Sequence, residues 1–451
     1  MGKKGFRLGR LLPLVTALAL VLALLFALAA PVSAATITVC AVGCDHTTIQ
    51  AAVNAANAND VIHAYPGTYN ESVDLSGMTP DGNITLMTVN SAGTPTPGTA
   101  TVNGGATGPA IYTVVPPSFS GNVTIDGFIV DSTVAHGVYL AVNGDVVIRN
   151  VIASGTGGHG IYVTQGDEVT ITHCTASNNG LTGILVVGVS GRVTISNCTA
   201  NNNDGSGIGA SAVTGDLTIN RCIARDNERD GVDLEDLQLG NTFVANRSIL
   251  CSNGGAEVDL DTPNNVTVDA EGNWWGCTAG PDGVDPACGG VLVVDQGSVD
   301  YSPWISLITA SATPDPGTVG QPTEVRFQFS DSARTIFLGK GPGDLHGAPT
   351  FTIHTDNGTL TDTDETGATV HEFIGSGNVL SVTLIPHTAG TAAVTLDGPC
   401  ELDAGIIVGM EAEFVPEPGT ILLLGSGLAG LAGYATLRLR SGQALRWRRR
   451  E

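Results

Sequence analysis

Short runs of alternating β-branched and polar residues recur along the middle of the chain, separated by clusters of Gly, Asn and Asp. Alternation of this kind predicts β-strands bounded by turns rather than helices. The first run of each repeat opens on a glycine, and these glycines are 23 or 24 residues apart: Gly137, Gly160, Gly183, Gly207 and Gly231. A period of this length predicts a solenoid in which each turn forms about three short strands and pairs in parallel with the next turn.

Two further columns follow the same period. Cysteines 24 residues apart form one of them: Cys174, Cys198 and Cys222. Asparagines form the other: Asn179, Asn203, Asn227 and Asn253. We expect the asparagine amides to stack as a ladder at turns, and the thiols to pack inward. Metal binding by the cysteine column would require the thiols to face outward.

Both ends of the repeat carry closing elements. Apolar residues in segment 48–59 recur at helical spacing, which predicts a short amphipathic helix over one open end. Three tryptophans follow the last repeat: Trp274, Trp275 and Trp304. We interpret them as closing the core, with stacking on carbohydrate as the alternative.

Two flanking motifs allow a comparison with a known fold. The segment Asp60-Val-Ile-His-Ala-Tyr-Pro-Gly-Thr-Tyr69 precedes the repeat, and Asn273-Trp-Trp-Gly276 follows it. With the repeat, they resemble the right-handed parallel β-helix proteins of the pectate-lyase-like superfamily over residues 35–307. This resemblance implies an all-β solenoid. It does not define a function, because that superfamily contains enzymes, adhesins and surface proteins.

A second module is expected after the repeat. Residues 308–414 contain alternating strand patterns with turn residues between them, which predicts a β-sandwich. The module is similar to the immunoglobulin-like domains of bacterial surface proteins.

Sorting signals occupy the two ends of the chain. Residues 1–34 have the basic start, apolar stretch and small-residue cleavage site of a signal peptide. Residues 415–451 contain Pro416-Glu417-Pro418, an apolar segment at 421–437 and an arginine cluster, and they resemble the PEP-CTERM signal. The resemblance implies a transmembrane helix and processing by an exosortase after signal peptidase has acted. Residues 441–445 split the arginine cluster, so a retained single-span anchor is the alternative.

The charge balance excludes one class of partner. The chain has 19 basic and 43 acidic residues and a net charge of -24, and more than half of its basic residues lie in the two ends. A body this acidic repels the phosphates of nucleic acids. We therefore expect no nucleic-acid binding.

The densest cluster of acids is the segment 225–236. Arg229, Asp230 and Asp233 are its candidate catalytic residues, and Asp226, Asp230 and Asp233 could hold Ca²⁺. A solvated turn with internal charge pairing is the competing interpretation. The resemblance implies that a lyase of this superfamily would use Arg or Lys as its base, and the lysine that remains after both ends are removed, Lys340, lies outside the repeat.

The histidines and cysteines complete the candidate residues. Gly158-His159-Gly160 is similar to a polygalacturonase motif, but His136 occupies the same position one turn earlier, so we interpret both as repeat positions. Close spacing makes Cys40 with Cys44, and Cys277 with Cys288, candidate disulfides of an exported chain.

The sequence thus predicts an exported cell-surface or extracellular protein, with a right-handed parallel β-helix followed by a smaller immunoglobulin-like β-sandwich. We expect a non-catalytic protein that is structural, adhesive or bound to extracellular polysaccharide or a surface layer. A polysaccharide lyase or glycoside hydrolase acting on acidic glycans is the alternative. No cofactor is expected other than the Ca²⁺ considered above.

Overall fold

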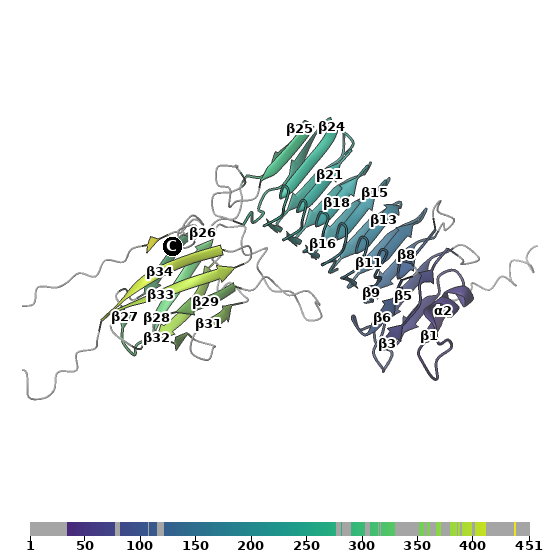
Figure 1. Ribbon diagram of the computed structural model, residues 1–451, viewed down its shortest axis with the longest axis horizontal. Coiled ribbons are helices and arrows are strands. Elements are labelled where there is room, and N and C mark those ends of the chain that lie inside the picture. Colours follow the sequence, from purple (N-terminus) through teal and green to yellow (C-terminus); the bar gives the residue numbers. More distant parts are fainter. Residues whose placement is uncertain are drawn as a thin grey trace, which may run out of the picture.

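The computed structural model places most of the central part of the chain (Figure 1). The described residues are 34–76, 82–106, 108–114, 121–276, 281, 290–302, 307–313, 315, 317–329, 351–355, 359–360, 367–370, 379–385, 387, 390–398, 402–411 and 437–438. The signal peptide up to residue 33, the motif Pro416-Glu417-Pro418 and residues 421–436 lie outside this set, as do Cys277 and Cys288. Within the described residues, no helix is long and apolar enough to cross a membrane.

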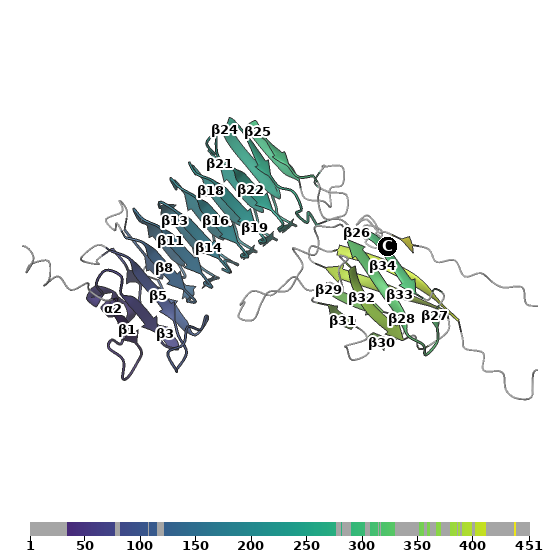
Figure 2. The same cartoon turned by 180° about the vertical axis from the view of Figure 1, so that it is seen from behind.

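The repeat folds into a right-handed β-solenoid of about nine turns, as its periodicity predicts. Successive turns pair in parallel and stack their strands into three sheets (Figure 2). The first sheet contains β1 (Thr36–Val39), β2 (Val61–Ala64), β5 (Ile84–Thr88), β8 (Val123–Asp126), β11 (Val146–Arg149), β14 (Val169–Thr172), β16 (Val193–Ser196), β19 (Leu217–Asn220) and β22 (Phe243–Asn246).

Two further sheets complete each turn. The second sheet contains β3 (Gly67–Tyr69), β6 (Ala100–Asn103), β9 (Ile129–Asp131), β12 (Ile152–Ala153), β17 (Thr199–Asn201), β20 (Ile223–Arg225) and β23 (Ile249–Cys251). The third sheet contains β4 (Val73–Asp74), β7 (Ile111–Tyr112), β10 (Val138–Ala141), β13 (Ile161–Gln165), β15 (Ile184–Val187), β18 (Ile208–Ser211) and β21 (Val232–Glu235). At the last turns the long strands β24 (Val258–Asp269) and β25 (Val291–Asp300) pair in parallel, and β24 joins the third sheet to the first.

Identical positions of successive turns lie directly above one another. In the first sheet the central isoleucines are in register and at most 1% exposed: Ile125, Ile148, Ile171, Ile195 and Ile219. Burying one such side chain contributes roughly 1.5–3 kcal/mol, so the column is a main source of stability. The cysteine column is also buried, with each thiol at most 1% exposed, which agrees with inward packing.

The N-terminal end of the solenoid is covered by the helix α2 (Ile49–Ala55), which packs on β1, β2 and β4. Thr48 caps this helix by accepting a hydrogen bond from the Ala51 backbone N–H. The carboxylate of Glu71 accepts two more, from the N–H groups of Ile49 at 2.7 Å and Gln50 at 2.9 Å. Cys40 and Cys44 form a disulfide beside this cap.

Tryptophans occupy the core at the other end. Trp274 and Trp275 are fully buried, and the ring of Trp275 meets that of Tyr301 edge-on with centroids 6.4 Å apart. They close the core and are not available for stacking on a carbohydrate. Cys251, on β23 nearby, is disulfide-bonded to a cysteine that lies outside the described residues, so the pairing of Cys277 with Cys288 stays a prediction.

The chain after the solenoid forms two further sheets. One contains β26 (Leu307–Thr313), β28 (Thr323–Phe329), β32 (Val379–Ile385) and β30 (Thr359–Leu360). The other contains β27 (Gly317–Thr318), β34 (Leu402–Glu411), β33 (Gly390–Gly398), β29 (Phe351–Thr355), β31 (Gly367–Val370) and β35 (Leu437–Arg438). Val325, Phe327 and Leu384 are fully buried. The immunoglobulin-like assignment and the boundaries of 308–414 stay predictions.

Candidate functional site

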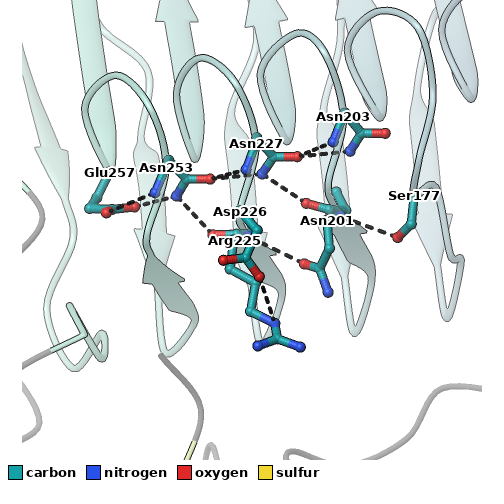
Figure 3. A network of polar contacts seen from close by, with 10 residues as sticks. Ser177, Asn201, Asn203, Arg225, Asp226, Asn227, Asn253 and Glu257 are labelled. Carbon is teal, nitrogen blue, oxygen red and sulfur yellow. Dashed lines mark hydrogen bonds and ion pairs between the residues drawn. The ribbon is translucent and has the colours of Figure 1, made fainter. Parts of the chain in front are cut away.

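The asparagine column forms a continuous hydrogen-bonded ladder along one edge of the solenoid (Figure 3). Each Oδ1 accepts from both the backbone N–H and the Nδ2 of the asparagine one turn earlier, as between Asn203 and Asn179 at 3.0 Å for both bonds. Each Nδ2 also donates to a backbone carbonyl of the preceding turn, as Asn203 does to Ala176. Since these amides are saturated by the fold, the ladder is structural and not a ligand site.

The glycine column makes room for this ladder. A Cβ at Gly183 would lie 2.7 Å from Nδ2 of Asn203, and a Cβ at Gly207 would lie 2.8 Å from Nδ2 of Asn227. Glu257 takes the corresponding glycine position 26 residues after Gly231. A side chain fits there because the ladder ends at Asn253.

Glu257 terminates the ladder and is the most deeply buried carboxylate of this region. It is 1% exposed, and Oε2 accepts a hydrogen bond from Nδ2 of Asn253 (Figure 3). Burial raises the pKa of Glu257 to about 7, and the charges of Asp226 and Asp230 act in the same direction. A carboxyl group in this position takes up a proton near neutral pH.

A second group of acids lies on the outer face of the third sheet, where β21 and β24 run side by side. Asp233 is in register with Asp259, and Glu235 is in register with Asp261. We call these four residues, with Asp230, the acidic half of this face. Like charges directly opposite each other on neighbouring strands are destabilising.

Serine links two carboxylates of the acidic half. Ser206 Oγ lies 3.4 Å from Oδ2 of Asp230 and 3.2 Å from Oδ2 of Asp233. Burial, followed by the charges of Glu235 and Asp230, raises the pKa of Asp233 to about 6. Asp230 itself is 6% exposed, and its Oδ1 accepts a hydrogen bond from the backbone N–H of Ala256 at 2.8 Å.

Asp259 is the least satisfied of these acids. Its buried Oδ1 has no hydrogen-bond partner within the described residues. Burial and the charge of Asp230 raise its pKa, and the charge of Arg229 lowers it. The structure therefore brings the candidates Arg229, Asp230 and Asp233 into one electrostatic group, with Asp259 as a member that the sequence analysis missed.

The three acids expected to hold Ca²⁺ do not all share this environment. Asp226 is exposed, adopts a left-handed backbone conformation with φ of 56°, and pairs with Arg225 at 3.6 Å. Asp230 and Asp233 meet at Ser206 instead. In the part of the chain that the structure describes, no group of three or more His, Cys, Asp or Glu side chains is arranged to hold a metal ion. The set Asp226, Asp230 and Asp233 stays a prediction from sequence alone.

Aromatic rings cover the other half of the same face. The rings of His136 and His159 stack with centroids 5.1 Å apart, and those of Tyr139 and Tyr162 lie 5.2 Å apart. Tyr112 is in register with Tyr139 one turn earlier. We call these five residues the aromatic half. All five are partly exposed, so their rings are accessible from the solvent.

The histidines of the aromatic half are neutral near pH 7. Burial lowers the pKa of His136, and burial together with the neighbouring His136 lowers that of His159 to about 4. Nδ1 of His136 accepts a hydrogen bond from the backbone N–H of His159 at 3.0 Å, which also requires an unprotonated Nδ1. Repetition in successive turns places both rings, as the sequence analysis expects for repeat positions.

The sequence contains a signal for the residues that were missed. Val232-Asp-Leu-Glu235 and Val258-Asp-Leu-Asp261 are near-copies 26 residues apart, so one further repeat would have aligned Asp259 with Asp233. Glycine is absent from the second copy, because Glu257 replaces it. A search for glycines at a period of 23 or 24 therefore stops one turn too early.

Comparisons with known proteins agree with the fold. Residues 118–269 match the family model described as a right handed beta helix region, and residues 414–438 match the PEP-CTERM protein-sorting motif. No curated protein matches the chain.

Similar solved structures include three with distant sequences. Pectate lyase Pel9A is 15% identical with a TM-score of 0.41, covering 61% of this chain and 79% of that one. The A-module of the mannuronan C-5 epimerase AlgE4 of Azotobacter vinelandii is 15% identical with a TM-score of 0.33, covering 57% and 92%. The tailspike protein gp49 of the Acinetobacter baumannii bacteriophage Fri1, a capsular polysaccharide depolymerase, is 10% identical with a TM-score of 0.22, covering 78% and 80%.

Proposed function

We propose that this right-handed parallel β-helix protein, which carries a PEP-CTERM sorting motif, binds extracellular polysaccharide at the cell surface without cleaving it. The sorting motif supports export and processing by an exosortase. A β-helix supplies a long, rigid face whose side chains repeat at the spacing of its turns, about 4.8 Å. Such a face suits a polymer that presents the same group many times.

The aromatic half is the observation that carries this proposal. Sugar rings have apolar C–H faces that stack on aromatic side chains, and Tyr139 and Tyr162 offer two such surfaces in adjacent turns. The buried carboxylates favour binding over catalysis, because Asp230 and Glu257 are engaged in hydrogen bonds that hold the turns. Groups fixed in this way stabilise the fold and are poorly placed to exchange protons with a substrate.

Replacing Tyr139 and Tyr162 together by Ala is expected to lower polysaccharide affinity at least tenfold. Each ring is an aromatic anchor of the kind that dominates binding energy, and about 1.4 kcal/mol corresponds to one factor of ten. Retardation of the protein in gels containing bacterial exopolysaccharide measures the affinity.

The matched control replaces Thr170 and Thr194 by Ala. These residues face outward from adjacent turns of the first sheet, where no aromatic residue is expected to contact the polymer. The control should bind like the unchanged protein. Equal retardation of the tyrosine variant and the control would contradict the proposal.

Glycoside hydrolysis is a second candidate function, and one observation favours it. Asp230 and Asp233 meet at Ser206, and only Asp233 has a raised pKa, of about 6. Two carboxyl groups with different proton affinities can act as acid and base. Under the binding proposal, incubation with polyuronates should release no new reducing ends. Release that disappears in Arg229→Ala and Asp230→Ala variants would replace binding by catalysis.

A further inference from the structure

One line of outward side chains crosses both halves of the third sheet's outer face. Successive strands contribute Tyr112, Tyr139, Tyr162, Leu185, Gly209, Asp233 and Asp259 to this line. The aromatic rings occupy its first part and the carboxylates its last part, with a leucine and a glycine between them. A linear ligand lying along the solenoid axis would therefore contact both halves.

The acidic half has little compensating positive charge among the described residues. The ion pairs of the solenoid that the structure describes join Arg149 to Asp126 and Arg225 to Asp226, and none of these four residues is on the line. Arg229 acts on Asp259, but the backbone still places Asp233 opposite Asp259 and Glu235 opposite Asp261. Positive charge from a ligand would relieve this repulsion.

The aromatic half also favours positive charge. Its two histidines are neutral near pH 7, so they do not repel a cation. The faces of Tyr139 and Tyr162 carry the negative part of the ring quadrupole, which attracts ammonium groups. The net charge of -24 adds a long-range attraction of the same sign.

We infer that the polysaccharide bound on this face is a hexosamine polymer with free, protonated amino groups. This inference rests on the proposed function and names its ligand class. The sugar rings stack on the aromatic half, and the ammonium groups of the following units lie against Asp233 and Asp259. A polyuronate would bring more carboxylates to the acidic half, and a fully N-acetylated polymer would leave its charges uncompensated.

Calorimetry on the full-length chain can test the inference with three probes of equal length. They are chitosan hexasaccharide, its fully N-acetylated form and hexamannuronate, each measured with EDTA and with added Ca²⁺. We expect chitosan hexasaccharide to bind at least tenfold more tightly than the other two in both conditions. The Asp233→Asn and Asp259→Asn double variant should lose at least tenfold of this affinity, since it removes two charges and keeps the shape of the side chains.

The matched control is the Asp167→Asn and Glu168→Gln double variant. It also removes two charges, from exposed residues in the turn between β13 and β14, and should bind chitosan hexasaccharide like the unchanged chain. Thermal melting verifies that each variant is folded. Equal loss in the control would show that only net charge matters, which would overturn the inference.

The other outcomes separate the inference from the proposed function. If the N-acetylated probe binds as tightly as chitosan and the tyrosine variant weakens both, the function stands and the amine specificity is wrong. Binding of hexamannuronate only with Ca²⁺ would also overturn the amine specificity, in favour of a bridging cation. If none of the three probes binds and exopolysaccharide gels do not retard the protein, both proposals fail.

Discussion

Replacing Asn203 by Ala is expected to lower the free energy of unfolding of the β-helix by about 4 kcal/mol. The side chain is fully buried and lies in the middle of the ladder. Its loss leaves three buried groups without their partner: the backbone N–H and Nδ2 of Asn179, and the carbonyl of Ala176. Each unsatisfied buried group costs about 1–3 kcal/mol. Urea denaturation followed by tryptophan fluorescence measures the loss, since Trp274 and Trp275 are buried in the last turns.

The control for this change is Asn220→Ala. Asn220 faces outward at the end of β19 and is partly exposed, so its replacement should change the free energy of unfolding by less than about 0.5 kcal/mol. Equal stabilities of the two variants would contradict a structural role for the ladder. A smaller loss with a broadened transition would instead mean that the solenoid unfolds turn by turn, as repeat proteins can.

The core of the solenoid follows from the sequence because it depends on local spacing. Val and Ile recur every 23 or 24 residues, and parallel pairing of successive turns then requires them to stack. The same reasoning placed Asn179, Asn203, Asn227 and Asn253 in one ladder. Only the short-range period is needed for these predictions, and no knowledge of loop conformation enters.

The candidate site was less predictable because it depends on side-chain direction within turns. Asp226 and Asp230 are four residues apart, yet the left-handed conformation of Asp226 directs it to Arg225, while Asp230 bonds to the backbone of Ala256. Spacing alone contains no information on this difference. The pairing of Asp233 with Asp259 needed the 26-residue period of the last turn, which departs from that of the others.

The aromatic half illustrates a third case, in which residues were recognised but their use was not. His136 and His159 were interpreted correctly as repeat positions, and the tyrosines three residues after each belong to the same repeat. Their joint exposure on one face requires the register of β10 with β13. A repeat position can therefore be structural in its backbone and functional in its side chain.

Replacing Glu257 by Gln is expected to raise the free energy of unfolding by about 3 kcal/mol at pH 8. The pKa of this carboxyl is about 7 in the folded protein against its ordinary value of 4.5, so the folded state binds the proton more tightly than the unfolded state. A shift of one pKa unit corresponds to about 1.36 kcal/mol. Stability from the protonated group is full below about pH 4.5, is lost as the pH rises to about 7, and changes little above that.

Glutamine removes this penalty because it stays neutral at every pH and its side-chain oxygen can still accept the hydrogen bond from Nδ2 of Asn253. The difference between the variant and the unchanged protein should therefore be large at pH 8 and close to zero at pH 4.5, in urea denaturation at both pH values. Other acids titrate equally in both proteins and cancel. Glu228→Gln, an exposed position on the preceding turn, controls for the loss of one charge and should shift stability by less than about 0.5 kcal/mol at either pH. A stabilisation by E257Q that is the same at pH 4.5 and pH 8 would show that Glu257 is already protonated, or not buried as a charge, across this range.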